Sequence, residues 1–166
     1  MNGTKQNEEF LTIDGSVLEG GGSILRLSIA FSVITGQSIE IINIRKGRSK
    51  PGLATQHLVG LQVMAGLFGL QLEGAFIGSD SIRTSYGKEP SPIYNARIKT
   101  AGSVSLVFQP VLIASVTNER KLQIQVKGGG TFGKAAPPVD YLENVYCSIL
   151  RQQGIKSALK ISKHGF

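Results

Sequence analysis

Apolar and polar positions along the first half of the chain follow two periods, and this pattern predicts strands that alternate with helices. Residues 11–13 and 38–44 are short, apolar and rich in β-branched side chains, as strands are. Residues 22–35 are apolar on nearly every side and long enough for a buried helix. Apolar side chains recur at helical spacing through residues 52–69, and residues 70–78 then form a further strand that runs into a turn.

The second half repeats this order. Residues 95–100 and 122–126 are strand-like, and residues 102–116 form an apolar helix that opens with Gly-Ser, as the first helix does. Residues 138–154 predict an amphipathic helix that ends at a glycine, and residues 155–161 could close the unit as a last strand. Two successive β-α-β-α-β units are the natural interpretation.

We therefore expect an α/β (α+β) chain with helices packed on small sheets. A lead-in at residues 1–10 precedes a first repeat at residues 11–92 and a second repeat at residues 93–166. Pro110 conflicts with the third helix, because proline lacks a backbone donor and clashes with the preceding turn. We expect it to kink or break that helix.

Composition narrows the class of protein only moderately. The 166 residues are 41% hydrophobic and 17% charged, which is typical of a folded globular domain. The net charge of +7 favours polyanionic partners without establishing one. A single cysteine, Cys147, excludes a disulfide framework and indicates a reducing compartment. No apolar run reaches membrane-spanning length, and the polar N-terminus does not resemble a signal peptide, so we expect a cytoplasmic protein, or a nucleoplasmic one in a eukaryote.

The segment EGGGSILR at residues 19–26 is the most informative local feature. Three glycines allow the backbone to approach a ligand closely, and the following helix N-terminus offers free N–H groups to a phosphate. Glu19 could hold a divalent metal there, and Arg26 falls one to two turns into the helix. A glycine-rich turn without a ligand fits the same residues, so both interpretations stay open.

A basic loop and three polar residues on helices are further candidates. Arg45, Lys46, Arg48 and Lys50 lie within six residues between a strand and a helix, which suits phosphate binding, although a solvated turn is commoner. Gln56 and His57 follow on the second helix, where His57 lies on the apolar face and could be purely structural. Gln109 precedes Pro110 in an apolar helix, so it either satisfies the backbone freed by the proline or faces a ligand.

The segment GGGTFGK at residues 128–134 nearly matches a phosphate-binding P-loop. That pattern requires Ser or Thr after the lysine, but Ala135 follows, and two prolines delay the next helix. A working P-loop is therefore not expected.

Several segments taken together resemble the RNA 3'-terminal phosphate cyclase family in order and spacing. They are DGSVLEGGGSILRLSIAFSVITG, IRKGRSKPGLATQHLVGL, LEGAFIGS, KTAGSVSLVFQ and APPVDYLENV. The resemblance implies tandem β-α-β-α-β-β repeats like the C-terminal domain of translation initiation factor three. It also implies a reaction in which ATP adenylates an enzyme histidine, AMP moves to an RNA 3'-phosphate, and the 2'-hydroxyl closes a 2',3'-cyclic phosphate with release of AMP.

The resemblance assigns roles residue by residue. Metal binding by Mg²⁺ or Mn²⁺ falls to Glu19, and nucleotide contacts fall to Glu19, Gln109 and Pro137. Phosphate contacts and site lining fall to Arg26, Arg45, Arg48, Gln56 and His57. Ser23 stands where many members of the family have glutamine, which is a mild departure.

The resemblance also implies that the chain corresponds to the N-terminal half of the family. The nucleophilic histidine belongs to the other half, and His164 is not its substitute, so we expect the chain alone to be inactive. The expected partners are RNA with a 3'-phosphate end, together with the missing C-terminal half or further copies of this chain. A non-catalytic RNA-binding scaffold of the cyclase-like type, acting in ribosome biogenesis, is the alternative.

Overall fold

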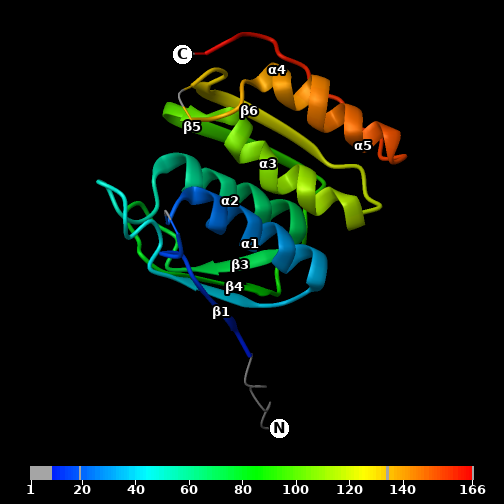
Figure 1. Ribbon diagram of the computed structural model, residues 1–166. Coiled ribbons are helices and arrows are strands. Elements are labelled where there is room, and N and C mark those ends of the chain that lie inside the picture. The colour runs from blue at the N-terminus through cyan, green and yellow to red at the C-terminus, as the bar shows by residue number, and fades with distance from the viewer. Residues whose placement is uncertain (1–8, 19, 134, 166) are drawn as a thin grey trace, which may run out of the picture.

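The computed structural model describes residues 9–18, 20–133 and 135–165, and it is a mixture of helices and strands in which β3, β4 and β5 follow one another without a helix between them (Figure 1). The elements of the first half are β1 (Leu11–Asp14), α1 (Gly22–Thr35), β2 (Ile39–Ile42), α2 (Thr55–Phe68), β3 (Leu70–Glu73) and β4 (Ile82–Tyr86). Those of the second half are β5 (Ile93–Ser103), α3 (Val104–Ala114), a 3₁₀ turn (Ser115–Thr117), β6 (Gln123–Gly130), α4 (Val139–Tyr141), a π-helical segment (Leu142–Cys147) and α5 (Ser148–Gln152). The mixed α/β class predicted from the sequence is confirmed.

The first half builds a four-stranded sheet in the order β1-β2-β4-β3. Strands β1 and β2 are parallel, with Leu11 opposite Ile39, and are joined through α1. Strand β4 is antiparallel to both of its neighbours, β2 and β3. The sequence pattern missed β4, because IRTSY has three consecutive polar residues and lacks the apolar alternation of a strand.

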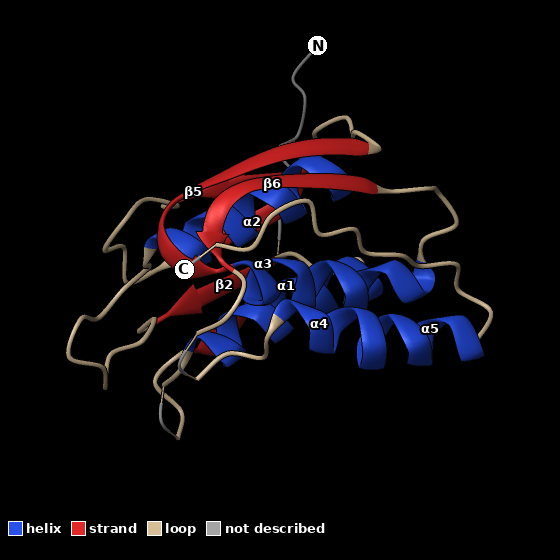
Figure 2. Ribbon diagram, turned by 90° about the horizontal axis from the view of Figure 1, so that it is seen from above, coloured by secondary structure: helices blue, strands red, loops and turns tan. Residues whose placement is uncertain are grey.

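The second half builds a two-stranded parallel sheet from β5 and β6, in register from Ile93 opposite Gln123 to Ile98 opposite Gly128. These strands are joined through α3, so each half of the chain contains its own parallel β-α-β unit. The predicted strand at residues 155–161 is wrong, because the segment has no regular secondary structure and pairs with no strand among the described residues. Seen from above, β5 and β6 lie along one side of the molecule, whereas α4 and α5 lie along the opposite side (Figure 2).

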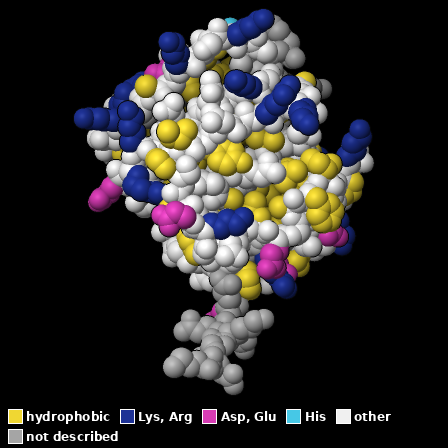
Figure 3. All heavy atoms as spheres, turned by 180° about the vertical axis from the view of Figure 1, so that it is seen from behind, with side chains coloured by type: hydrophobic (Ala, Val, Ile, Leu, Met, Phe, Trp, Pro, Cys, Tyr) yellow, Lys and Arg dark blue, Asp and Glu magenta, His cyan; other side chains and the backbone are white. Residues whose placement is uncertain are grey.

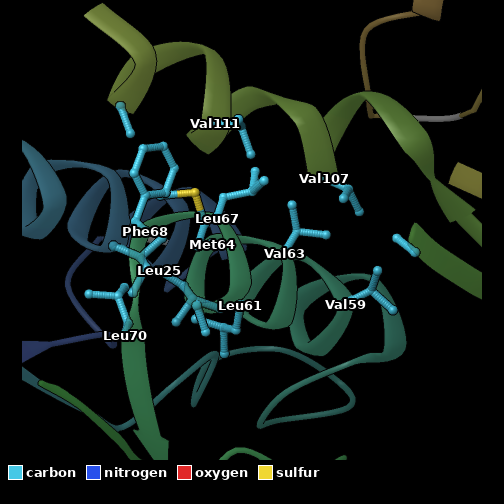
Figure 4. Close-up of a cluster of buried hydrophobic side chains, with 14 of the residues drawn as sticks. Leu25, Val59, Leu61, Val63, Met64, Leu67, Phe68, Leu70, Val107 and Val111 are labelled. Carbon is cyan, nitrogen blue, oxygen red and sulfur yellow. The ribbon is translucent and has the colours of Figure 1, made fainter. Parts of the chain in front are cut away.

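Helix α2 joins the two halves because it packs on β3, β5 and α3, and α1 also packs on α3. This position explains why α2 is apolar on most of its circumference. Met64 and Leu67 of α2 are fully buried, and α3 contributes the buried Val107 and Val111 to the same core (Figure 4). A Cβ at Gly66 would overlap the Tyr94 ring, so glycine is what allows α2 to approach β5 so closely.

Helix α3 continues through Pro110, so the expected break does not occur. The Ser103 hydroxyl caps its start by accepting a hydrogen bond from the Leu106 N–H at 3.3 Å. The helix predicted over residues 138–154 is confirmed as the run from α4 to α5, and Gly154 follows it with a left-handed φ of 82°. Among the described residues, no helix combines the length and the apolar character that crossing a membrane requires.

Candidate functional site

The carboxyl ends of the parallel strands β1 and β2 lead into loops that lie against each other before α1 and α2 begin. The Gly15 N–H donates to the Ile42 carbonyl oxygen at 2.7 Å. A Cβ at Gly15 would stand 2.9 Å from that oxygen, so a side chain there would separate the loops. Side chains from residues 14–18, 20–26 and 43–57 are thereby brought to one edge of the sheet, where ligands of α/β folds commonly bind.

Helix α1 begins with two glycines that leave its N-terminus open to basic side chains. Gly21 is the N-cap and provides no side-chain cap. A Cβ at Gly21 would stand 3.1 Å from Arg48 Nη2, and a Cβ at Gly22 would overlap His57 Nε2 and stand 3.0 Å from Arg26 Nη1. Three of the predicted site residues therefore converge where helical N–H groups and the positive end of the helix dipole favour an anion.

His57 is held neutral and oriented at this site. Its Nδ1 accepts a hydrogen bond from the Ala54 N–H at 3.1 Å, so the proton of the neutral ring is assigned to Nε2, the atom that faces Gly22. Burial, followed by the positive charges of Arg45 and Arg26, lowers the pKa of His57 to about 4. At neutral pH this ring is a structural partner of the α2 N-terminus and, through Nε2–H, a hydrogen-bond donor toward the site.

Arg26 is oriented by a side chain from the other half of the chain. Its Nε donates to Gln109 Oε1 at 2.8 Å, and Gln109 Nε2 donates to the Tyr146 hydroxyl at 3.4 Å. Burial lowers the pKa of Arg26, but a guanidinium stays charged in a protein. Of the two alternatives for Gln109, the backbone freed by Pro110 is not the observed partner: the amide instead joins Arg26 to Tyr146.

The two arginines of the basic loop occupy different positions. Arg45 has a left-handed φ of 56°, and its Nη1 donates to the Gly52 carbonyl oxygen at 2.7 Å. Burial and the nearby charge of Arg48 lower the pKa of Arg45. Arg45 therefore closes its own loop, whereas Arg48 is exposed and reaches Gly21 at the α1 N-terminus.

The remaining predicted residues lie at different distances from this cluster. Gln56 Oε1 accepts a hydrogen bond from the Ser103 N–H at 2.8 Å, which ties the start of α2 to the end of β5. Pro137 is half-buried in the loop between β6 and α4, and among the described residues no hydrogen bond joins it to the arginines. Glu19 lies outside the described residues, among which no group of three or more His, Cys, Asp or Glu side chains could hold a metal.

Glycines 128–130 belong to β6, and the next helix begins only at Val139, so the described part of this segment does not have the loop-to-helix geometry of a P-loop.

Two residues that contact the site, Tyr146 and Ser103, were not predicted from the sequence. The available signal for Tyr146 was that the Gln109 amide, in an otherwise apolar helix, needs hydrogen-bond partners. Nothing in the sequence pointed to the backbone N–H of Ser103.

The fold and the site define the class of protein: a mixed α/β chain that gathers cationic side chains at a glycine-opened helix N-terminus. A family model described as RNA 3'-terminal phosphate cyclase matches residues 17–166. The chain is 42% identical to the RNA 3'-terminal phosphate cyclase of Archaeoglobus fulgidus over 157 residues, which are 95% of this chain and 48% of that protein. It therefore belongs to the RNA 3'-terminal phosphate cyclase family, as the resemblance implied.

Two further relatives named RNA 3'-terminal phosphate cyclase match this chain with similar identity and coverage. The protein of Thermococcus kodakarensis is 43% identical over 157 residues, covering 95% of this chain and 45% of the relative. The protein of Ralstonia nicotianae is 40% identical over 166 residues, covering 100% of this chain and 48% of the relative. The chain thus spans about half the length of the curated relatives it matches.

Proposed function

We propose that this chain supplies the phosphate-binding part of an enzyme that uses ATP to convert an RNA 3'-phosphate into a 2',3'-cyclic phosphate. The relatives carry the name of that activity. The observation that carries the proposal is the convergence of Arg26, Arg48 and His57 on Gly21 and Gly22 at the α1 N-terminus. A terminal phosphate is a dianionic group that fits two guanidinium groups and a row of backbone N–H donors.

Each side chain has a distinct part in the proposal. Arg48 is exposed and meets the phosphate from solution, whereas Arg26 is partly buried and its direction is set by Gln109. His57 donates one neutral hydrogen bond from Nε2, because the backbone N–H of Ala54 occupies Nδ1. Together these groups neutralise charge on a phosphate without taking or giving a proton themselves.

ATP and a divalent metal are the proposed ligands of this arrangement. Glycines at positions 21 and 22 make a cradle that a Cβ would fill, which suits the close approach of a nucleotide phosphate. Gln109 and Pro137 are the proposed nucleotide contacts, and Glu19 is the proposed ligand of Mg²⁺ or Mn²⁺. Magnesium is commonly held by one or two carboxylates together with substrate phosphates, and it would neutralise phosphate charge here.

The covalent nucleophile is proposed to come from the part of the relatives that this chain does not span. Neither described histidine is assigned that role. His57 has its Nδ1 occupied, and the Nδ1 atom of His164 lies 3.1 Å from the Thr131 hydroxyl, in a hydrogen bond near the end of β6.

The direct test compares two trinucleotide RNAs that differ only in a 3'-phosphate or a 3'-hydroxyl, with binding followed by fluorescence anisotropy. We expect tighter binding of the 3'-phosphate RNA, and we expect Arg48→Gln to remove that preference. The matched control is Arg151→Gln, because Arg151 is bonded to Glu143 on the C-terminal helix. Equal affinity for the two RNAs would contradict the proposal.

Catalysis is tested by adding the second half of the Archaeoglobus fulgidus relative as a separate polypeptide, with ATP labelled in its α-phosphate. Covalent label on the added polypeptide, followed by cyclisation of the RNA end, is the expected result. Label on this chain alone would contradict the assignment of the nucleophile. Assembly of the two polypeptides with RNA binding but no cyclisation would favour the scaffold function.

A further inference from the structure

The outward face of the second sheet carries exposed basic side chains. Along β5, Ala96 and Ile98 are buried toward the helices, and the alternate residues Arg97 and Lys99 are exposed. On β6, Lys127 is exposed in the same way. Because side chains alternate between the two faces of a strand, these three cations lie on one surface, which we call the β5–β6 basic face.

Cross-strand pairing on this face differs from that on the first sheet. There, Arg83 of β4 lies opposite Glu40 of β2, and its Nε donates to Glu40 Oε1 at 2.9 Å. On the second sheet, Arg97 lies directly opposite Lys127. Like charges in directly opposed positions destabilise a sheet, so this pairing costs folding stability unless an anion lies over it.

The surroundings of the pair do not neutralise it. Among the described residues, the side chains of Arg97, Lys99 and Lys127 form no hydrogen bond and no ion pair. The neighbouring exposed pair on the same face is Asn95 opposite Gln125, whose amides are neutral donors and acceptors. In the view from behind, Lys and Arg side chains predominate over the upper part of the molecule, which contains β5 and β6 (Figure 3).

We propose that the β5–β6 basic face binds the phosphodiester backbone of RNA upstream of the 3' end held at the α1 N-terminus. The inference rests on the proposed function and extends it. Charge complementarity identifies the occupant: three unpaired cations with flanking amides contact phosphate and sugar oxygens without reading base sequence. Strand β5 connects the two places, because it runs from Arg97 to Ser103, whose N–H is bonded to Gln56 beside the site.

The length of this connection makes the proposal testable by RNA length. Ser103 lies six positions after Arg97 in β5, which corresponds to at most about 20 Å at roughly 3.3 Å per residue. A trinucleotide bound by its 3'-phosphate stays near the α1 N-terminus. A single strand of roughly 12 nucleotides, within the usual range for one binding domain, reaches the basic face.

The experiment measures binding of this chain to a trinucleotide and to a 12-nucleotide RNA, both with a 3'-phosphate, over a series of salt concentrations. The test variant is Arg97→Gln/Lys127→Gln. The matched control is Arg83→Gln/Lys88→Gln, which removes the same charge from the first sheet and its adjoining loop. For the 12-nucleotide RNA, loss of two phosphate contacts reduces the salt slope by about 1.4, at about 0.7 per contact on single strands. The control keeps the full slope.

The outcomes separate this inference from the proposed function. Weaker binding of the longer RNA by the test variant, with unchanged binding of the trinucleotide, supports the basic face. Equal losses in the test and control variants would overturn it, because general charge would then explain the effect. Equal affinity of the unmodified chain for both RNAs would also overturn it, yet leave 3'-phosphate recognition intact. Failure of the trinucleotide to bind, with the longer RNA still bound through the basic face, would count against the proposed function alone.

Discussion

Arg26 Nε on α1 donates a 2.8 Å hydrogen bond to Gln109 Oε1 on α3, although 83 positions separate the two residues in sequence. The bond joins the first half of the chain to the second. The direction of one proposed phosphate ligand therefore depends on how α1 and α3 pack together, and Tyr146 extends the connection to the C-terminal helix. The site consequently requires both halves of the chain.

Replacing Gln109 by alanine removes the acceptor that orients Arg26. A hydrogen bond to a charged group contributes about 1.5–3 kcal/mol, and partial exposure of the guanidinium places the expected loss of unfolding free energy near 1 kcal/mol. Affinity for a 3'-phosphate trinucleotide should fall several-fold. Urea denaturation and anisotropy measure the two effects. Gln153→Ala, an exposed glutamine after α5, is the control. Unchanged phosphate affinity in Gln109→Ala would show that Arg26 is oriented by other contacts.

Gly22→Ala tests whether the α1 N-terminus must stay free of side chains. The added Cβ would overlap His57 Nε2 and stand 3.0 Å from Arg26 Nη1, so both side chains would move away from the proposed phosphate position. Loss of one charge-assisted hydrogen bond corresponds to about tenfold weaker binding of the 3'-phosphate RNA.

Gly60→Ala is the matched control for this change. It places the same methyl group in the interior of α2, where an added Cβ meets nothing within 4 Å. It should leave RNA binding unchanged and raise the unfolding free energy by about 0.5–1 kcal/mol, because alanine favours a helix over glycine. Equal RNA affinities for the two variants would argue against the glycine cradle.

His57 should make the stability of the chain depend on pH below neutrality. Its pKa is about 4 in the folded chain and near 6.5 when unfolded, so the unfolded state binds more protons between these values. The contribution is complete above pH 6.5 and is lost as the pH falls toward 4. Between pH 7 and pH 5 the loss is about 2 kcal/mol.

Urea denaturation of the unmodified chain and of His57→Gln at both pH values isolates this effect, because glutamine keeps an acceptor for the Ala54 N–H and does not titrate. On acidification from pH 7 to pH 5, the variant should lose about 2 kcal/mol less unfolding free energy than the unmodified chain. Identical pH profiles would mean that His57 is protonated as readily in the folded chain as in the unfolded one.

Periodicity predicted most of the fold, because the helices and paired strands bury apolar faces that leave a local pattern. It failed where pairing depends on distant residues. Strand β4 is polar in sequence and is ordered by β2 and β3, whereas residues 155–161 alternate like a strand but have no paired neighbour among the described residues.

The candidate site also has parts that the sequence predicts and parts that only the fold reveals. Glycines and arginines near residues 19–26 and 44–52 were visible as a local motif. The contacts of Gln109 with Arg26 and of His57 with Gly22 arise only when α1, α2 and α3 pack together. Chemistry local to one segment is readable in the sequence, but its assembly with other segments requires the fold.

The isolated chain should self-associate through the apolar surface beside α1 and β1. A groove of about 410 Å³ lies between α1 and the edge strand β1, and Leu11, Leu27 and Phe31 line it with 56%, 40% and 53% of their surfaces exposed. Among the described strands, β1 pairs only with β2, so one edge of it is also open. Grouped apolar side chains beside an open strand edge favour association between chains.

Leu27→Glu/Phe31→Glu places two charges in this groove and should shift the chain toward the monomer in sedimentation velocity. Phe76→Glu is the control, because Phe76 is 62% exposed in the loop between β3 and β4 and does not line the groove. A monomeric unmodified chain at every concentration would contradict the prediction. A groove that mediates contact cannot bury two carboxylates without a large loss of affinity. If both variants therefore associate to the same extent, the association surface lies elsewhere on the chain.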